Sequence, residues 1–263
     1  MNFKTVIFIT FGGIVMCSCG ADRGTGPNVF GEGANASECF HSAFAKVGTT
    51  VDLNYEHTFE EVSEFKTKES LTVQGQTVFD GRTSNHASGP EWIVMDDQPR
   101  PYDKIIYYHI DQVELNYYEF GFERFATRGD AAYHRKVVYR PALERRFDLE
   151  VGESYTQFYS IYNNMAYDSP DTGSETEKTQ VDTIHVRRFD GFEVLALPVG
   201  EFSACKFSDE FTYIGENSDV TTTAFEWYDI ETGVLIRREY EDLYSGTQTT
   251  VFIGGAIDGD PVE

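Results

Sequence analysis

The chain has 263 residues, and its 44 acidic and 21 basic residues give a formal net charge of −23. Such a charge repels the phosphates of nucleic acids and anionic lipid headgroups, which argues against a nucleic acid partner and against polybasic membrane docking. The aromatic fraction is 15%, with 21 Phe and 16 Tyr, and these side chains favour β-sheet because they suit a pleated surface.

The first residues have the pattern of a signal peptide. Lys4 supplies a positive charge, and residues 5–16 (TVIFITFGGIVM) form an apolar run. The run is too short to cross a bilayer as a helix, which takes about 20 apolar residues. We therefore expect residues 1–18 to be removed, which places the mature protein outside the cytoplasm.

Residues 16–20 (MCSCG) resemble the bacterial lipobox, in which a small residue precedes the cysteine that becomes acylated and N-terminal. Cys19 fits best, because Ser18 is small and Met16 stands where an aliphatic residue belongs; Cys17 is the alternative. A cleaved signal peptide with two incidental cysteines is the competing interpretation. Each buried CH₂ of an acyl chain contributes about 0.8 kcal/mol, so two or more palmitate-like chains would hold the protein on a membrane.

Gly20 stands where lipoproteins of the inner membrane often carry an aspartate. By this resemblance we expect the protein at the outer membrane, facing the periplasm or the surface. The stretch that follows is rich in Gly and shows no periodicity, so residues 19–36 are expected to be the lipidated N-terminus and a flexible linker. A β domain is expected at residues 37–263.

The domain is predicted to be all-β. At most one short helix is expected, at Ser37–Val47, where Phe40, Phe44 and Val47 recur at helical spacing behind a serine cap. From there on, period-2 alternation and turn residues predict an antiparallel meander that forms a curved sheet or two packed half-barrel sheets. The expected strands are Thr50–Phe59, Glu64–Val73, Thr77–Asn85, Lys104–His109, Val113–Phe125, Ala132–Arg140, Ser154–Asn163, Glu177–Phe189, Glu193–Leu197, Ser203–Ile214, Thr221–Tyr228, Val234–Tyr240 and Thr247–Ile253.

The clearest hairpin runs from Leu195 to Phe211, around a Pro-Val-Gly-Glu turn. In its return strand Cys205, Phe207 and Phe211 share one face, as expected of a strand with one dry side. Asp209 interrupts that face.

A weak internal repeat divides the domain. Residues 44–55 (FAKVGTTVDLNY) resemble residues 149–159 (LEVGESYTQFY), and a Phe-Asp-Gly sequence occurs at 79–81 and again at 189–191. Two duplicated sheet modules, at 44–140 and 147–254, are one interpretation. Chance matches between turn sequences are the other interpretation.

Three motifs in the second half resemble those of the TapB-like envelope lipoproteins, a family of unknown function. Residues 148–155 (DLEVGESY) resemble the family's Pro-Leu-x-Val-Gly-x-x-Trp strand, with Tyr155 in place of Trp. Residues 192–206 (FEVLALPVGEFSACK) resemble its Pro-Ala-Gly turn, with Val199 in place of Ala, and the FEWY and GVLIRR sequences between residues 225 and 238 resemble its exit hairpin. The resemblance implies a curved sheet like that of periplasmic lipoprotein carriers, an apolar ligand, and no catalytic residues.

Cys39 and Cys205 would be the two thiols of the mature domain. In an oxidising compartment a disulfide between them is one interpretation, and a buried free thiol at Cys205 is the other.

No pattern for a metal, a cofactor or a catalytic centre is found. The six histidines lie outside HExxH or CxxC motifs, the chain has no GxSxG sequence, and its acidic loops lack a full calcium-binding pattern. We therefore predict no metal, no cofactor and no catalytic residue.

Three functions remain open. The leading hypothesis is a non-catalytic envelope lipoprotein, attached to the membrane by its N-terminus, whose sheet binds an apolar ligand or an envelope protein. The second is a carbohydrate-facing surface or adhesion module, and the third is a hydrolase without a recognisable motif. Aromatic residues that can stack on sugars or line an apolar groove are Trp92, Tyr107, Tyr108, Tyr117, Tyr118, Phe120 and Phe122.

Overall fold

The computed structural model describes residues 35–59, 65–95, 97–128, 130–170, 173–215, 218–242 and 246–262. The expected signal peptide at 1–18, both candidate acylation sites (Cys17 and Cys19) and the linker up to residue 34 lie outside these residues, and they stay predictions. Among the described residues, no helix is long and apolar enough to cross a membrane.

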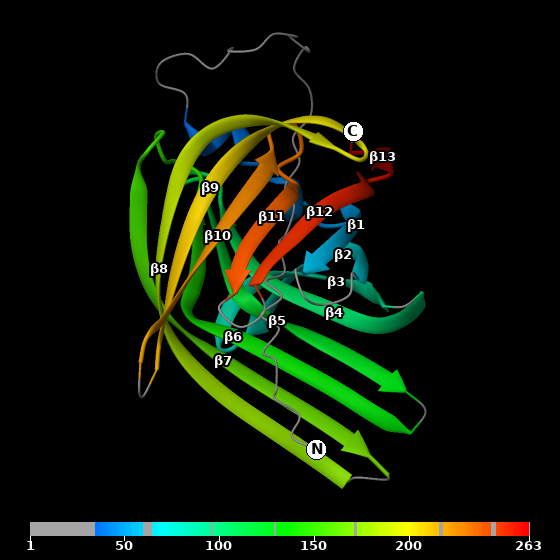
Figure 1. Ribbon diagram of the computed structural model, residues 1–263. Coiled ribbons are helices and arrows are strands. Elements are labelled where there is room, and N and C mark those ends of the chain that lie inside the picture. The colour runs from blue at the N-terminus through cyan, green and yellow to red at the C-terminus, as the bar shows by residue number, and fades with distance from the viewer. Residues whose placement is uncertain are drawn as a thin grey trace.

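The strands form one antiparallel meander that closes on itself as a barrel (Figure 1). Each strand pairs with the next along the chain, and β1 also pairs with β12. The prediction of an all-β antiparallel fold is confirmed, and the sheet is a single closed one. The strands are β1 (Thr50–Phe59), β2 (Phe65–Phe79), β3 (Arg82–Met95), β4 (Gln98–Asp111), β5 (Asn116–Arg128), β6 (Ala131–Arg146), β7 (Ser154–Ser169), β8 (Gly173–Leu197), β9 (Gly200–Ile214), β10 (Val220–Asp229), β11 (Leu235–Asp242), β12 (Gly246–Ile257) and β13 (Asp260–Pro261).

Alternation along the strands decides which side chains face inward. In β1, Val51, Leu53 and Tyr55 are buried, while the residues between them are half-buried and Thr58 is exposed. Because β1 has hydrogen-bonded neighbours on both sides, its buried face is the inner face of the barrel.

Several expected strand boundaries were wrong. The expected strand Val113–Phe125 begins inside the turn that precedes β5, which starts at Asn116. The expected strand Thr77–Asn85 spans the end of β2, a turn and the start of β3, and in that turn Asp80 and Gly81 have φ values of 51° and 75°. Positive φ at two successive residues is the geometry of a tight hairpin turn. The expected strands Glu177–Phe189 and Glu193–Leu197 are one long β8, because the register shift after Phe189 accommodates the Asp-Gly sequence as a bulge instead of a turn.

The expected helix at Ser37–Val47 does not form. Two 3₁₀ turns, η1 (Ala36–Cys39) and η2 (Ala43–Ala45), take its place. Tertiary contacts explain the difference: the Ala36 amide donates to the Leu149 carbonyl at 2.9 Å, and the Phe44 carbonyl accepts from the Tyr108 hydroxyl at 2.7 Å. These contacts hold the segment across one end of the barrel.

The two ends of the barrel therefore differ. At the end that carries η1 and η2, the β8–β9 hairpin also arches over the strands, and its Phe202 ring meets Phe252 edge-on (Figure 1). At the opposite end, β5–β8 project as long hairpins (Figure 1). The proposed halves, 44–140 and 147–254, contribute β1–β6 and β7–β12 to the same sheet, and the duplication itself stays a prediction.

Candidate functional site

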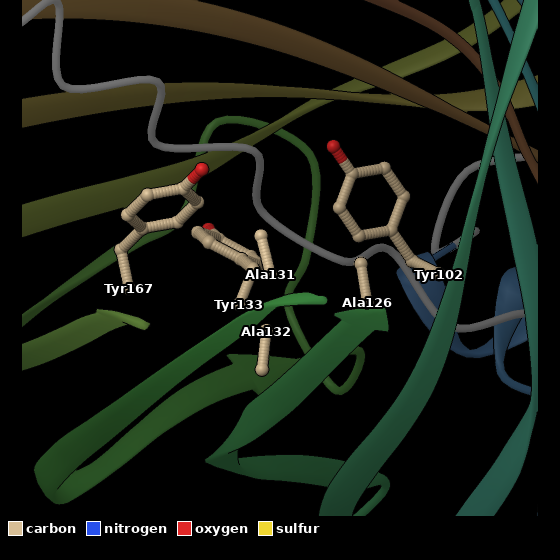
Figure 2. A pocket seen from close by; sticks show the side chains of 6 residues that line it. All are labelled: Tyr102, Ala126, Ala131, Ala132, Tyr133 and Tyr167. Atoms are coloured by element: carbon tan, nitrogen blue, oxygen red, sulfur yellow. The ribbon is translucent and has the colours of Figure 1, made fainter. Parts of the chain in front are cut away.

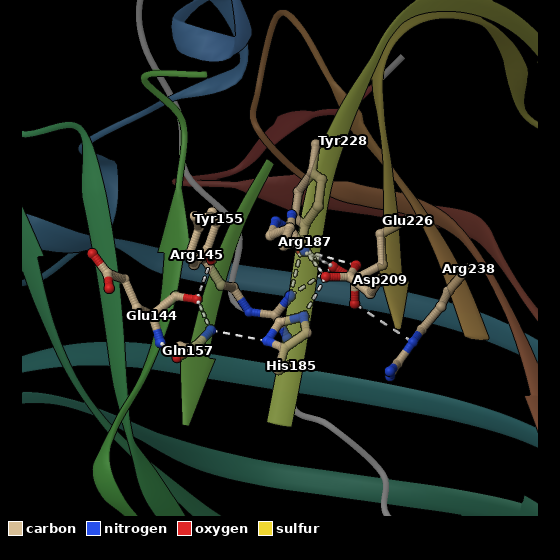
Figure 3. A network of polar contacts seen from close by, with 10 residues as sticks. All are labelled: Glu144, Arg145, Tyr155, Gln157, His185, Arg187, Asp209, Glu226, Tyr228 and Arg238. Atoms are coloured by element: carbon tan, nitrogen blue, oxygen red, sulfur yellow. Dashed lines mark hydrogen bonds and ion pairs between the residues drawn. The ribbon is translucent and has the colours of Figure 1, made fainter. Parts of the chain in front are cut away.

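Charged side chains from β6 to β11 meet inside the barrel (Figure 3). Nη1 of Arg187 on β8 donates to Asp209 on β9 at 2.9 Å and to Glu226 on β10 at 3.0 Å. Arg145 on β6 donates to the same Glu226 oxygen at 2.6 Å, and Arg238 on β11 lies 3.5 Å from the other oxygen. Because β6 and β10 are not neighbours in the sheet, these side chains meet across the interior.

A neutral histidine extends this network. Oε1 of Gln157 accepts from the Glu144 amide at 2.9 Å and Nε2 donates to the Glu144 carbonyl at 2.8 Å, which fixes the orientation of the amide. Nε2 of Gln157 therefore also donates to Nδ1 of His185 at 2.9 Å. The imidazole proton then lies on Nε2, which donates to Asp209 at 2.6 Å. Burial lowers the pKa of His185, in keeping with this neutral form.

The carboxylates of the network stay ionised. Burial acts to raise the pKa values of Asp209 and Glu226, but the arginines outweigh it: Arg187 holds the pKa of Asp209 below its ordinary value, and Arg145 with Arg187 does the same for Glu226. The Tyr228 hydroxyl adds a hydrogen bond to Glu226 at 2.6 Å. Each acid is therefore engaged by cations of the barrel itself.

A second ionic cluster lies between β2 and β5. Nζ of Lys104 is 2.8 Å from Glu69 and 3.3 Å from Glu91, and Arg124 donates to Glu91 at 2.8 Å. Lys104 is 2% exposed. Despite burial, the two glutamates keep the pKa of Lys104 above its ordinary value. The positive charges of Lys104 and Arg124 therefore balance the negative charges of the two glutamates in this cluster.

Glu119 on β5 is the exception among the interior acids. It is 0% exposed, and neither carboxylate oxygen has a hydrogen-bond partner among the described residues. Burial raises its pKa to about 7, while Arg145 and Lys104 act in the opposite direction. Glu119 therefore differs from Asp209 and Glu226, because burial and not a bound cation decides the direction in which its pKa moves.

The projecting end of the barrel holds a hollow of about 150 Å³ (Figure 2). Three tyrosines surround it: Tyr102 on β4, Tyr133 on β6 and Tyr167 on β7. The Tyr102 and Tyr133 rings meet edge-on with centroids 6.0 Å apart, and the register pairs Tyr133 with Tyr167 on one side and Ala126 on the other. Small side chains complete the lining, at Ala126, Ala131 and Ala132.

The structure brings only some of the residues singled out from the sequence together. Cys39 and Cys205 are joined in a disulfide, with Cα atoms 6.2 Å apart. This bond ties the N-terminal segment to β9 at the end of the barrel opposite the hollow.

The aromatic residues singled out from the sequence do not form a strip. Tyr108, Tyr117 and Phe122 belong to the interior core, whereas Tyr107 and Phe120 pack against Phe79 in a separate cluster. Among the described residues, no group of three or more His, Cys, Asp or Glu side chains is placed to hold a metal ion.

Sequence reasoning missed both the interior ions and the tyrosine hollow. A signal for the ions was present: Asp209 stands on the apolar face of β9, and His185 and Arg187 alternate in step with buried Phe189 on β8. Charged residues at positions where alternation predicts burial indicate partners of opposite charge. The hollow has no such local signal, because its tyrosines come from three strands.

The chain matches no protein-family model, and no curated protein is significantly similar to it. The resemblance to TapB-like lipoproteins therefore stays a prediction.

Solved structures give distant likenesses. A candidate lipoprotein from Parabacteroides distasonis ATCC 8503 is 14% identical, with a TM-score of 0.42 over 82% of this chain and 96% of that one. A candidate exported protein with a YmcC-like fold from Bacteroides fragilis NCTC 9343 is 10% identical, with a TM-score of 0.40 over 83% and 97%. The hypothetical lipoprotein YmcC from Escherichia coli K12 is 9% identical, with a TM-score of 0.32 over 80% and 88%. Likenesses this distant assign neither a family nor a function to this chain.

Proposed function

We propose that this protein is a non-catalytic lipoprotein of a bacterial outer membrane, anchored by acyl chains on Cys19, whose barrel presents its hollow end to a partner or ligand in the envelope. Cys17 is the alternative anchor. The lipobox resemblance at residues 16–20 supports the anchor.

The observation that carries the proposal is the placement of the N-terminal segment. Asn35, the first described residue, directly precedes η1. It pairs with Glu150, which follows the end of β6, and the Ala36 amide donates to the Leu149 carbonyl beside it. The hollow lies at the start of β6, whose 16 residues span about 50 Å at about 3.3 Å per residue. A tether at the N-terminus therefore attaches to one end of the barrel and leaves the other end free.

The interior favours a role without catalysis. Its ionised acids are held by arginines, and His185 is fixed between Gln157 and Asp209. The Arg145–Glu226 contact crosses the space that an acyl chain would have to occupy. We therefore prefer a partner or polar ligand at the free end to an apolar ligand inside.

Expression of the full chain in a Gram-negative host tests the anchor. We expect intact mass and membrane fractionation to find a mature chain that begins at Cys19, carries acyl chains and sediments with the outer membrane. Cys19→Ser should abolish acylation, and Cys17→Ser, the matched control, should retain it. A mature chain whose Cys17 and Cys19 are both unmodified would overturn the proposal.

A further inference from the structure

The tyrosine hollow has the chemistry of a sugar-binding site. Tyr102, Tyr133 and Tyr167 offer flat apolar ring faces together with hydroxyl groups that both donate and accept hydrogen bonds. A sugar ring presents the same combination, since its C–H bonds lie on one face and its hydroxyls lie around the rim. Figure 2 shows the three rings standing around the hollow and coming from separate strands.

The size of the hollow limits what it can hold. Its volume of about 150 Å³ is below the range of about 300 Å³ and more that drug-sized ligands occupy. A single ring fits, whereas a larger ligand must extend into solvent. Tyr167 is 43% exposed, so a ring that stacks on this side chain stays in contact with solvent.

The walls of the hollow are held by the sheet. Tyr133 pairs with Ala126 on β5 and with Tyr167 on β7, so a small residue lies beside two large ones along one row of the sheet. The Arg124 guanidinium lies 5.6 Å from the centre of the Tyr102 ring and is itself bound to Glu91. The site is therefore preorganised, which lowers the entropic cost of binding.

The negative charge of the protein limits the class of sugar that the hollow can bind. Glu175 on β8 pairs with Tyr167 and is exposed, and the chain as a whole carries a net charge of −23. The negative charge disfavours the approach of an acidic saccharide, and the nearby Arg124 and Arg135 are already engaged by side chains of the barrel.

We propose that the hollow lined by Tyr102, Tyr133 and Tyr167 binds one ring of a neutral oligosaccharide. This inference rests on the proposed function only in that the anchor leaves the hollow end free. It assigns a ligand class to the end of the barrel farthest from the N-terminal segment.

The test uses the full mature chain and an array of neutral and carboxylated glycans, followed by saturation-transfer NMR with any neutral trisaccharide that binds. Binding of neutral glycans is expected to weaken by about tenfold or more in Tyr167→Ala, which removes a stacking face, and in Ala126→Phe, which fills the hollow. Phe158→Ala is the matched control, because Phe158 is exposed on the opposite face of the same strand and should leave binding unchanged.

Two results would overturn the proposal: no neutral glycan on the array binds, or binding persists unchanged in both Tyr167→Ala and Ala126→Phe. Binding restricted to carboxylated glycans counts against it as well. Thermal unfolding of each variant separates loss of the site from loss of the fold, and Tyr167→Ala changes an exposed side chain. Acylation of Cys19 is measured independently, so either proposal can fail while the other stands.

Discussion

Replacement of Glu119 by Gln should stabilise the protein, and the gain should grow with pH. The carboxyl is fully buried, and burial raises its pKa from the ordinary 4.5 to about 7. The folded state therefore holds this proton more tightly than the unfolded state does. Between pH 4.5 and pH 7, unfolding releases the proton, and stability falls as the pH rises through that window.

The magnitude follows from the same two values. A rise from 4.5 to about 7, at about 1.36 kcal/mol for each pH unit, corresponds to about 3 kcal/mol once the pH exceeds 7. Below pH 4.5 the carboxyl is protonated in both states and contributes nothing to the pH dependence. The difference in unfolding free energy between Glu119→Gln and the wild type should therefore increase by about 2 to 3 kcal/mol between pH 5 and pH 8.

Urea unfolding, followed by the fluorescence of Trp92 and Trp227, measures this difference. Other titrating groups are common to both proteins and cancel, as does any pH-independent effect of the Gln side chain. Glu210→Gln is the matched control, because Glu210 is exposed on β9 and its replacement should change stability by less than about 0.5 kcal/mol at either pH. If the gain from Glu119→Gln is the same at pH 5 and pH 8, the carboxyl is already ionised in the folded protein and the reasoning is refuted.

Three further predictions concern the bonds that hold the barrel. The oxidised chain should be lighter by two hydrogens than its reduced form. Replacement of both Cys39 and Cys205 by Ala should cost about 5 kcal/mol in urea unfolding, by the chain-entropy estimate for a separation of 166 residues; an unchanged midpoint would contradict it. Arg187→Met leaves Asp209 and Glu226 without their shared cation and should cost about 3 to 5 kcal/mol, whereas the more exposed Arg188→Met should cost at most about 1 kcal/mol. Arginines hold the pKa of Glu226 below 4.5, so its contribution to stability is present above pH 4.5 and is lost as the pH falls below that value. Glu226→Gln should therefore lose less stability than the wild type between pH 5 and pH 3, and an equal loss would count against this assignment.

Local sequence patterns predicted much of the fold. The expected strand Thr50–Phe59 matches β1, because its alternation is uninterrupted and its inner face is apolar up to Tyr55. In residues 37–47 the local pattern was misleading. Phe40 and Phe44 recur at helical spacing because both pack into the end of the barrel, and the disulfide and the contact with Leu149 determine the backbone conformation there. Closure was not predictable, because Val51 pairs with Ile257 and nothing local in either strand specifies the other.

The filling of the interior bears on the apolar ligand that a curved sheet led us to expect, and that ligand stays a prediction. Barrels of about eight strands have an interior that side chains just fill, and those of about sixteen leave a channel, so a barrel closed by β1 and β12 lies between. Short apolar side chains cannot reach across such a width, whereas Arg145 and Glu226 meet from strands on different sides. Long charged side chains cannot be buried alone, so they come in compensating sets.

This filling favours the ends of the barrel as the place for the proposed binding function. One end carries η1, η2 and the Cys39–Cys205 bond, and its backbone groups are engaged by Leu149 and Tyr108. At the other end, where β5–β8 project, the small side chains of Ala126, Ala131 and Ala132 leave a hollow between the three tyrosines. We therefore expect the proposed binding function at the ends of the strands and not in the interior, whose charged side chains already hold the sheet together.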